Sequence, residues 1–176
     1  QIQFIPNTPQ YTKAAQAHSK DYGSLESTNQ SADVAIKKID QILSPENKVP
    51  FDHSFGGYNA ALVTSHYPDA LDLQANIESL KNDMKIAGLA AFRAGGSIGQ
   101  MTEREWPIVE GMIATITPKL SETEARKKLG EVRDYMDSLK TRARQTYDSS
   151  WQDSQFYAPP EARKPAQDAP VGGTDA

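Results

Sequence analysis

Residues 11–44 read YTKAAQAHSKDYGSLESTNQSADVAIKKIDQILS, and this stretch decides the fold. Side chains recur along it at alternating steps of four and three residues, at Tyr11, Ala15, His18, Tyr22, Leu25, Asn29, Ala32, Ile36, Ile39 and Leu43. That heptad register predicts a long helix with one apolar seam. We favour an amphipathic helix packed on its own domain. The alternative is a self-associating coiled coil, in which Asn29 would fix the register.

Three further helices are expected, over residues 69–94, 102–116 and 121–147. Each has an apolar stripe at helical spacing, formed by Leu73, Ile77, Leu80, Met84 and Ala87, by Trp106, Val109, Met112, Ile113 and Ile116, and by Ala125, Leu129, Val132, Met136, Leu139 and Ala143. Capping boxes are expected at Thr102–Glu105 and Ser121–Glu124. The sequence therefore predicts an all-α fold, a small helical domain of about four helices with a long N-terminal heptad-patterned helix and extended terminal arms.

The segments outside these helices are rich in proline. Residues 45–68 are expected to form a long loop whose aromatic side chains pack onto the helices or a partner. Residues 1–10 and 155–176 are expected to be arms that become ordered only against other chains, because large apolar anchors are costly to leave in water. The candidate partner-binding residues in these arms are Ile2, Phe4, Ile5, Phe156 and Tyr157.

A glycine-rich segment joins the second and third expected helices. Its glycines permit backbone conformations with positive φ, and its single isoleucine is expected to plug the core. The candidate residues of this helix-reversal turn are Gly95, Gly96, Ile98, Gly99, Thr102 and Glu105. The order of residues is not that of a phosphate-binding loop.

No catalytic, cofactor-binding or metal-binding site is expected. The chain has no cysteine, which excludes disulfides and thiolate chemistry. His18, His53 and His66 lack the spacing of metal ligands, and Asp52 beside His53 is not accompanied by a nucleophile elbow. The acidic pairs Glu103/Glu105 and Glu122/Glu124 fall in the first turns of helices, where capping and the helix dipole explain them.

The charges do not indicate a nucleic-acid-binding surface, so contact with nucleic acid is left open without support, and no membrane span is expected. There are 19 basic and 23 acidic residues, for a net charge of −4. Basic residues 126–128 and 140–144 alternate with acidic ones, which favours a solvated helix face over a phosphate-binding surface. Lys140, Arg142 and Arg144 are expected in the last turns of their helix. No apolar run approaches the roughly 20 residues that span a bilayer. Because the chain begins with Gln1, we expect it to be processed or part of a longer protein.

The stretch from about residue 32 to residue 139 resembles a domain that recurs in virion and ejection-associated proteins of tailed bacteriophages. The block GGSIGQMTEREWPIVEGMIATI, followed by LSETEARKKLGEVRDYM, carries the resemblance, with a glycine-rich turn and a Thr-Glu pair leading into an apolar helix. Helices like SADVAIKKIDQIL and DLQANIESLKNDMKIAGLAAFR precede it. Trp106-Pro107 departs from the leucine-rich form of the block, which leaves the start of that helix open.

The resemblance implies a virion component without catalytic residues, made in the bacterial cytoplasm and bound to other virion proteins and to copies of itself. The head–tail connector, the tail and the ejection apparatus all remain open as its place. A second hypothesis is a soluble adaptor or regulator encoded by a phage or prophage that acts outside the particle. A third is a cell-wall hydrolase that uses the acidic residues, and it has the least support in the sequence.

Overall fold

The computed structural model describes residues 3–56, 67–93 and 105–160. These residues form five α-helices and a short 3-10 turn, and they contain no β-strand. The helices are α1 (Pro9–Leu43), α2 (Lys48–Ser54), α4 (Pro68–Arg93), α5 (Glu105–Ala114) and α6 (Glu122–Trp151), and the 3-10 turn is η1 (Pro45–Asn47). The expected all-α class and the long N-terminal helix are confirmed.

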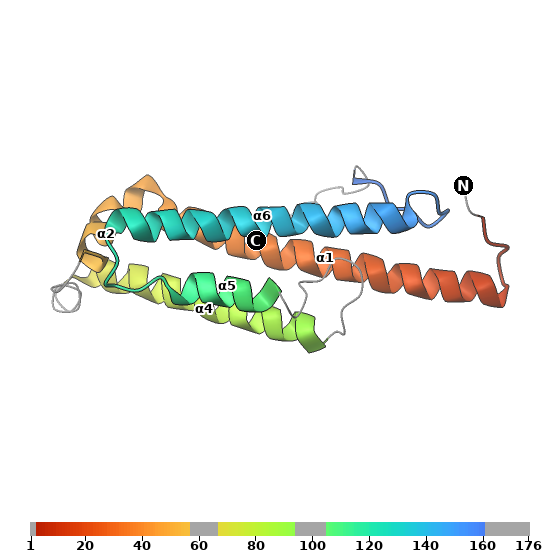
Figure 1. The fold of residues 1–176 in the computed structure, drawn as a ribbon, viewed down its shortest axis with the longest axis horizontal. Coiled ribbons are helices and arrows are strands. Elements are labelled where there is room, and N and C mark those ends of the chain that lie inside the picture. Colours follow the sequence, from red (N-terminus) through yellow and green to blue (C-terminus); the bar gives the residue numbers. More distant parts are fainter. Residues whose placement is uncertain (1–2, 57–66, 94–104, 161–176) are drawn as a thin grey trace, which may run out of the picture.

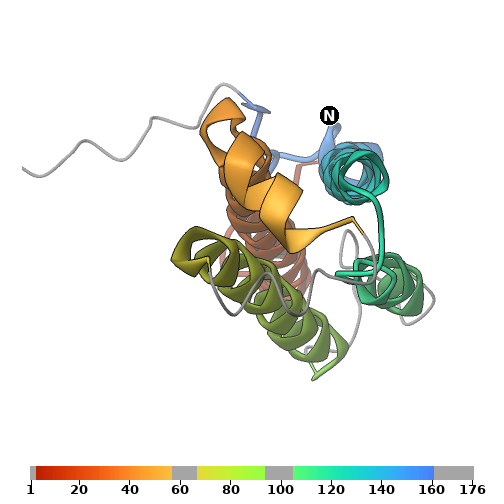
Figure 2. The ribbon, with the colours of Figure 1, turned by 90° about the vertical axis from the view of Figure 1, so that its left-hand side faces the viewer.

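The two longest helices, α1 and α6, lie antiparallel along the whole length of the molecule (Figure 1). Helices α4 and α5 cover only the part of this hairpin nearer α2. Viewed from the end, the helices follow the order α1, α6, α5 and α4 around a common core (Figure 2), with α2 across the end. Neighbouring helices run in opposite directions, as in an up-down-up-down bundle.

Local interactions explain where helix α1 begins and ends. The Thr8 hydroxyl accepts a hydrogen bond from the Tyr11 backbone N–H at 3.2 Å, and Pro9 follows in the first turn, where its missing N–H costs nothing. At the other end, Pro45 cannot continue the helix. The Asn47 side chain donates hydrogen bonds to the carbonyls of Gln41 and Ile42, at 2.8 and 3.1 Å.

The first part of the expected loop 45–68 is helical, so that prediction is wrong for residues 45–54. Two rings explain the difference, because Phe51 and Phe55 stack with centroids 5.4 Å apart and are both buried in the main core. Pro50 sits in the first turn of α2, where proline is tolerated. Gly56 ends this segment with a φ of 118°, and its N–H donates to the Leu120 carbonyl at 2.8 Å. Residues 57–66 lie outside the described residues.

The main core, which we call the proximal core, lies among all five helices. The expected stripe of α6 is confirmed, since all six of its residues are buried. The other helices also bury residues of their expected stripes, namely Leu73, Ile77, Leu80 and Met84 of α4, Val109 and Ile113 of α5, and Ile116 just beyond α5. The side chains of Ala87 and Trp106 lie outside the described set. The Ser121–Glu124 capping box is present, and the hydrogen bonds from the Ser121 side chain and backbone lower the pKa of Glu124.

Helix α6 extends beyond its expected end at residue 147 and ends at Trp151. The basic residues 140–144 therefore lie two or more turns before the C-terminus and cannot serve the helix dipole there. Instead, Lys140 pairs with Asp33 and Arg133 pairs with Asp40 at 2.6 Å, both across the α1–α6 interface. The partners are seven residues apart on each helix and run in opposite order. This fixes the antiparallel register of the hairpin.

A second, smaller core lies at the far end of the hairpin, and we call it the distal core. It is built from Leu25, Ala143 and Tyr147, with Tyr22, Trp151, Tyr157 and Ala158 packed against them. Between the two cores, α1 buries the polar residues Thr28 and Asn29. The heptad seam of α1 is thus covered by other helices of the same chain, as we expected from the sequence.

We expect Leu129→Ala and Gly130→Ala to have opposite effects on stability, although the residues are neighbours on α6. Leu129 is fully buried, so its truncation should lower the free energy of unfolding by about 2–5 kcal/mol. A Cβ at Gly130 would meet nothing within 4 Å, so alanine there should raise the free energy of unfolding by about 0.5–1 kcal/mol. Urea denaturation followed by circular dichroism measures both. A stabilising Leu129→Ala would contradict the assignment of the proximal core.

Candidate functional site

Near the distal core, the first and the last described segments of the chain meet, and the most elaborate set of side-chain interactions among the described residues lies there. After α6 ends, tight turns formed by Ser154 N–H to Trp151 O (2.7 Å) and Tyr157 N–H to Ser154 O (3.1 Å) reverse the chain. Residues 154–158 consequently lie back against α6. Figure 1 shows this segment beside the last turns of α6, close to the start of the chain.

Two side chains of α6 hold Ala158 by its backbone. The Ala158 N–H donates to the Tyr147 hydroxyl at 3.0 Å, and its carbonyl accepts from the Arg144 guanidinium at 2.9 Å. Because the segment belongs to no helix or strand, these side chains supply the partners that a peptide group needs when it leaves water. Burial raises the pKa of the Tyr147 hydroxyl, which therefore stays protonated at neutral pH.

Arg144 also ties Tyr157 to α6. Its guanidinium donates to the Tyr157 hydroxyl at 2.9 Å and pairs with Asp148 at 2.7 Å, while the Tyr157 hydroxyl donates to the Asp148 carboxylate at 2.9 Å. The guanidinium also lies over the rings of Tyr147 and Tyr157. These interactions form a closed polar network on one side of the distal core, which fixes where the C-terminal segment docks.

The N-terminal segment docks on the C-terminal one through a contact that we call the terminal clasp, formed by Phe4, Gln155 and Phe156. The Phe4 N–H donates to the Gln155 side-chain oxygen at 3.3 Å, and the Gln155 amide donates to the Phe4 carbonyl at 3.4 Å. The rings of Phe4 and Phe156 stack with centroids 6.0 Å apart. Phe156 also lies 5.3 Å from the Tyr11 ring. The clasp thus links residues 151 positions apart in the sequence.

The clasp corrects the prediction that the arms order only against other chains. Phe4, Phe156 and Tyr157 are partly buried against the chain itself, so their rings do not need a partner to leave water. Ile5 differs, because 75% of its surface is exposed. Its role in partner binding stays a prediction. Ile2 and residues 161–176 lie outside the described residues.

The expected helix-reversal turn cannot be placed, since Gly95, Gly96, Ile98, Gly99 and Thr102 all lie outside the described residues. Glu105 is the first residue of α5, and its side chain is likewise not described. Glu103 also lies outside the described residues, whereas the acids at the start of α6 have ordinary structural roles. Glu122 pairs with Arg126 at 2.7 Å, and Glu124 completes its capping box.

The neighbourhood of His53 resembles a catalytic pair only superficially. The His53 Nδ1 lies 3.7 Å from the Asp69 carboxylate, beyond hydrogen-bonding distance, and its ring stacks on Tyr67 at 3.9 Å. The adjacent Ser54 hydroxyl donates to the Ala70 carbonyl, which leaves it without a base that could activate it. His66 lies outside the described residues. No group of three or more potential metal ligands occurs in the described part of the chain.

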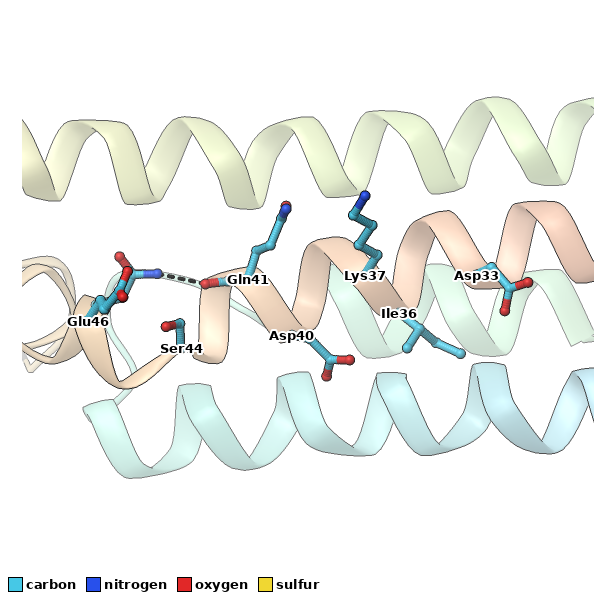
Figure 3. Close-up of a pocket in the computed structure, with 8 residues that line it drawn as sticks. Asp33, Ile36, Lys37, Asp40, Gln41, Ser44 and Glu46 are labelled. Carbon is cyan, nitrogen blue, oxygen red and sulfur yellow. Dashed lines mark hydrogen bonds between the residues drawn. The ribbon is translucent and has the colours of Figure 1, made fainter. Parts of the chain in front are cut away.

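A shallow groove of about 600 Å³ follows the outer face of α1 and reaches η1 (Figure 3). Its lining is charged or polar apart from Ile36. Of its carboxylates, Asp33 and Asp40 are already paired with basic residues of α6. The figure shows Lys37 and Gln41 pointing toward α4, away from these two acids. An open groove of this kind lacks the enclosed apolar walls that bury most of a small molecule.

Comparisons with protein-family models, with curated proteins and with solved structures found no match to this chain. None of the described helices is long and apolar enough to cross a membrane. The resemblance to phage virion proteins therefore stands as a proposal based on the sequence alone.

The distal core was not predicted from the sequence. His18 and Tyr22 were expected in the seam of α1, but their aromatic partners Tyr147 and Trp151 lie beyond the last expected apolar residue of α6. The signal that could have found it is the four-residue step from Ala143 to Tyr147 and Trp151, which continues the buried face of the helix.

We expect Arg144→Met to release the C-terminal segment and to lower the free energy of unfolding by about 1–3 kcal/mol, because hydrogen bonds to a charged group are lost in a partly buried setting. Arg142→Met is the matched control, since Arg142 lies on the exposed face of the same turn. Chemical denaturation and amide exchange at Ala158 measure the two effects. Equal losses in both variants would contradict the role given to Arg144.

Proposed function

We propose that this protein is a non-enzymatic structural component of a bacteriophage particle that acts by binding other protein chains. The observation that carries the proposal is the resemblance of the block beginning at Gly95 and its flanking helices to a domain of virion and ejection-associated proteins. The proposed partners are other virion proteins and copies of this chain. The proposed location is the particle, after synthesis in the bacterial cytoplasm.

The arrangement of the described residues is compatible with a binding role. An antiparallel bundle gives a rigid rod, and the paired helices α1 and α6 extend beyond the part covered by α4 and α5 (Figure 1), where the distal core lies. The terminal clasp holds the backbone beside Ile5 while the Ile5 side chain stays exposed. A fixed, exposed apolar side chain loses little conformational entropy when it docks, which favours its use as a contact.

The direct test is the protein content of purified particles. We expect this chain at a fixed, stoichiometric copy number, measured by quantitative mass spectrometry against the major capsid protein. Its absence from particles made by a producing strain that contains it would contradict the virion proposal and favour the adaptor hypothesis.

A second test addresses the contact itself. We expect Ile5→Asp to reduce incorporation into particles by about tenfold or more, because a charge would have to be desolvated where an apolar group docks. Gln3→Asp is the control, since it adds the same charge to the same exposed segment. Thermal unfolding should be unchanged in both variants. Equal incorporation of both would remove Ile5 from the interface.

A further inference from the structure

His18 is partly buried against the distal core. Its ring lies 5.0 Å from Trp151 in an edge arrangement and 5.8 Å from both Tyr22 and Phe156, with which it stacks. It thereby contacts α1, α6 and the C-terminal segment at once. Phe156 in turn stacks on Phe4 in the terminal clasp. A change at the His18 ring therefore affects the contacts of both the N-terminal and the C-terminal segment.

The hydrogen bonds around Tyr147 favour one of the two neutral tautomers of His18. The Tyr147 hydroxyl has one proton, and it accepts the Ala158 N–H at 3.0 Å. The other neighbour of this hydroxyl is the His18 Nε2, at 2.8 Å. All three groups are satisfied when Tyr147 donates to an unprotonated Nε2, which makes His18 neutral with its proton on Nδ1.

A proton added to Nε2 would disturb this arrangement. Two donors, the imidazolium and the Ala158 N–H, would then face the Tyr147 oxygen, and the tyrosine proton would have to turn away from His18. Losing that donor–acceptor match weakens the hydrogen bond between the Tyr147 hydroxyl and the Ala158 N–H, which holds Ala158 in place. Protonation of His18 is therefore linked directly to the docking of the C-terminal segment.

The groups around His18 have opposing effects on its protonation. On α1, the Asp21 carboxylate favours the imidazolium, although it also accepts the Trp151 indole N–H at 3.1 Å. The surrounding ring faces favour a cation as well. On α6, Arg144 lies over the neighbouring Tyr147 ring and is paired with Asp148. Tyr22 and Tyr157 add hydroxyl groups to the same region. Burial is the largest influence, and it lowers the pKa of His18.

We propose that the distal core is a pH-operated latch, in which protonation of His18 releases residues 154–158 and Phe4 from the α1–α6 hairpin. The polar stretch of α1 that includes Thr28 and Asn29 separates this region from the proximal core. Regions joined by few apolar contacts open as separate units. The latch can therefore open while the proximal core stays folded. It is a property of the single chain and does not depend on the proposed place in a particle.

The direction of the pH dependence follows from the lowered pKa. Below the ordinary histidine value of 6.5, the released form binds a proton that the closed form does not. The closed form is therefore most stable above that pH, and it loses stability as the pH falls toward the pKa of His18 in the closed latch. Below that lower pKa, both forms are protonated and the dependence ends.

Amide exchange of the full chain, followed by NMR at about pH 7.5 and about pH 5, tests the latch on either side of an ordinary histidine pKa. After correction for the intrinsic exchange rate, we expect protection at Tyr157 and Ala158 to fall at least about tenfold at the lower pH. Protection of Val132 in the proximal core should persist. Parallel loss at Val132 would show global unfolding and overturn the proposal.

Two variants make the test specific. His18→Phe keeps an aromatic ring but cannot titrate, so exchange at Ala158 should become independent of pH, whatever its absolute level. His53→Asn removes a histidine at the other end of the bundle and should leave the wild-type dependence intact. An unchanged dependence in His18→Phe would overturn the proposal.

The wild-type protein provides a test that needs no variant. Long-range ¹H–¹⁵N spectra report both the protonation state and the tautomer of each histidine. We expect His18 to carry its proton on Nδ1 at neutral pH and to titrate together with the loss of protection at Ala158. A proton on Nε2 at neutral pH, or a titration that does not coincide with release, would overturn the latch.

Discussion

The antiparallel pairing of α1 with α6 is the constraint on which the rest of the structure depends. The pairing of Asp33 with Lys140 and of Asp40 with Arg133 sets its register, and the heptad seam of α1 supplies the buried surface. Exposed ion pairs contribute little free energy, so the apolar seam provides the stability and the charges select the register. Once this hairpin is in place, α4 and α5 complete the proximal core, and the aromatic rings of both chain ends meet at the other extremity.

The helical part of the fold was predictable because its signals are local and periodic. Every expected core residue of α6 is buried, and the Ser121–Glu124 capping box marks its start. The four-and-three spacing identifies a buried face without any knowledge of what covers it. It does not choose between one chain and two, however. That choice depends on whether a second stripe of matching period and complementary charge exists in the same chain, and α6 provides one.

The elements that escaped prediction depend on single contacts between residues far apart in the sequence. Helix α2 forms in a proline-bounded segment because Phe51 and Phe55 pack in the proximal core. The Arg126 guanidinium also lies 4.0 Å from the centre of the Phe51 ring. The terminal clasp joins Phe4 to Gln155, and no local sequence pattern predicts such a pair. Proline-rich composition predicted few backbone hydrogen bonds within the arms. It could not show that Tyr147 and Arg144 would supply partners for Ala158.

The clasp changes what the aromatic anchors of the arms can do. Phe4 and Phe156 were expected to be free for a partner, but each already covers part of the other and of the distal core. A partner that takes up Phe4 must compete with these contacts, so its binding and the opening of the clasp share one free-energy balance. If protonation of His18 weakens the closed form, the same change must strengthen any interaction that requires the released arm, since linkage is reciprocal. Ile5 is exempt from this competition because it is exposed in the closed form. The N-terminal segment therefore offers two kinds of contact, one available at once and one available only after the distal core opens.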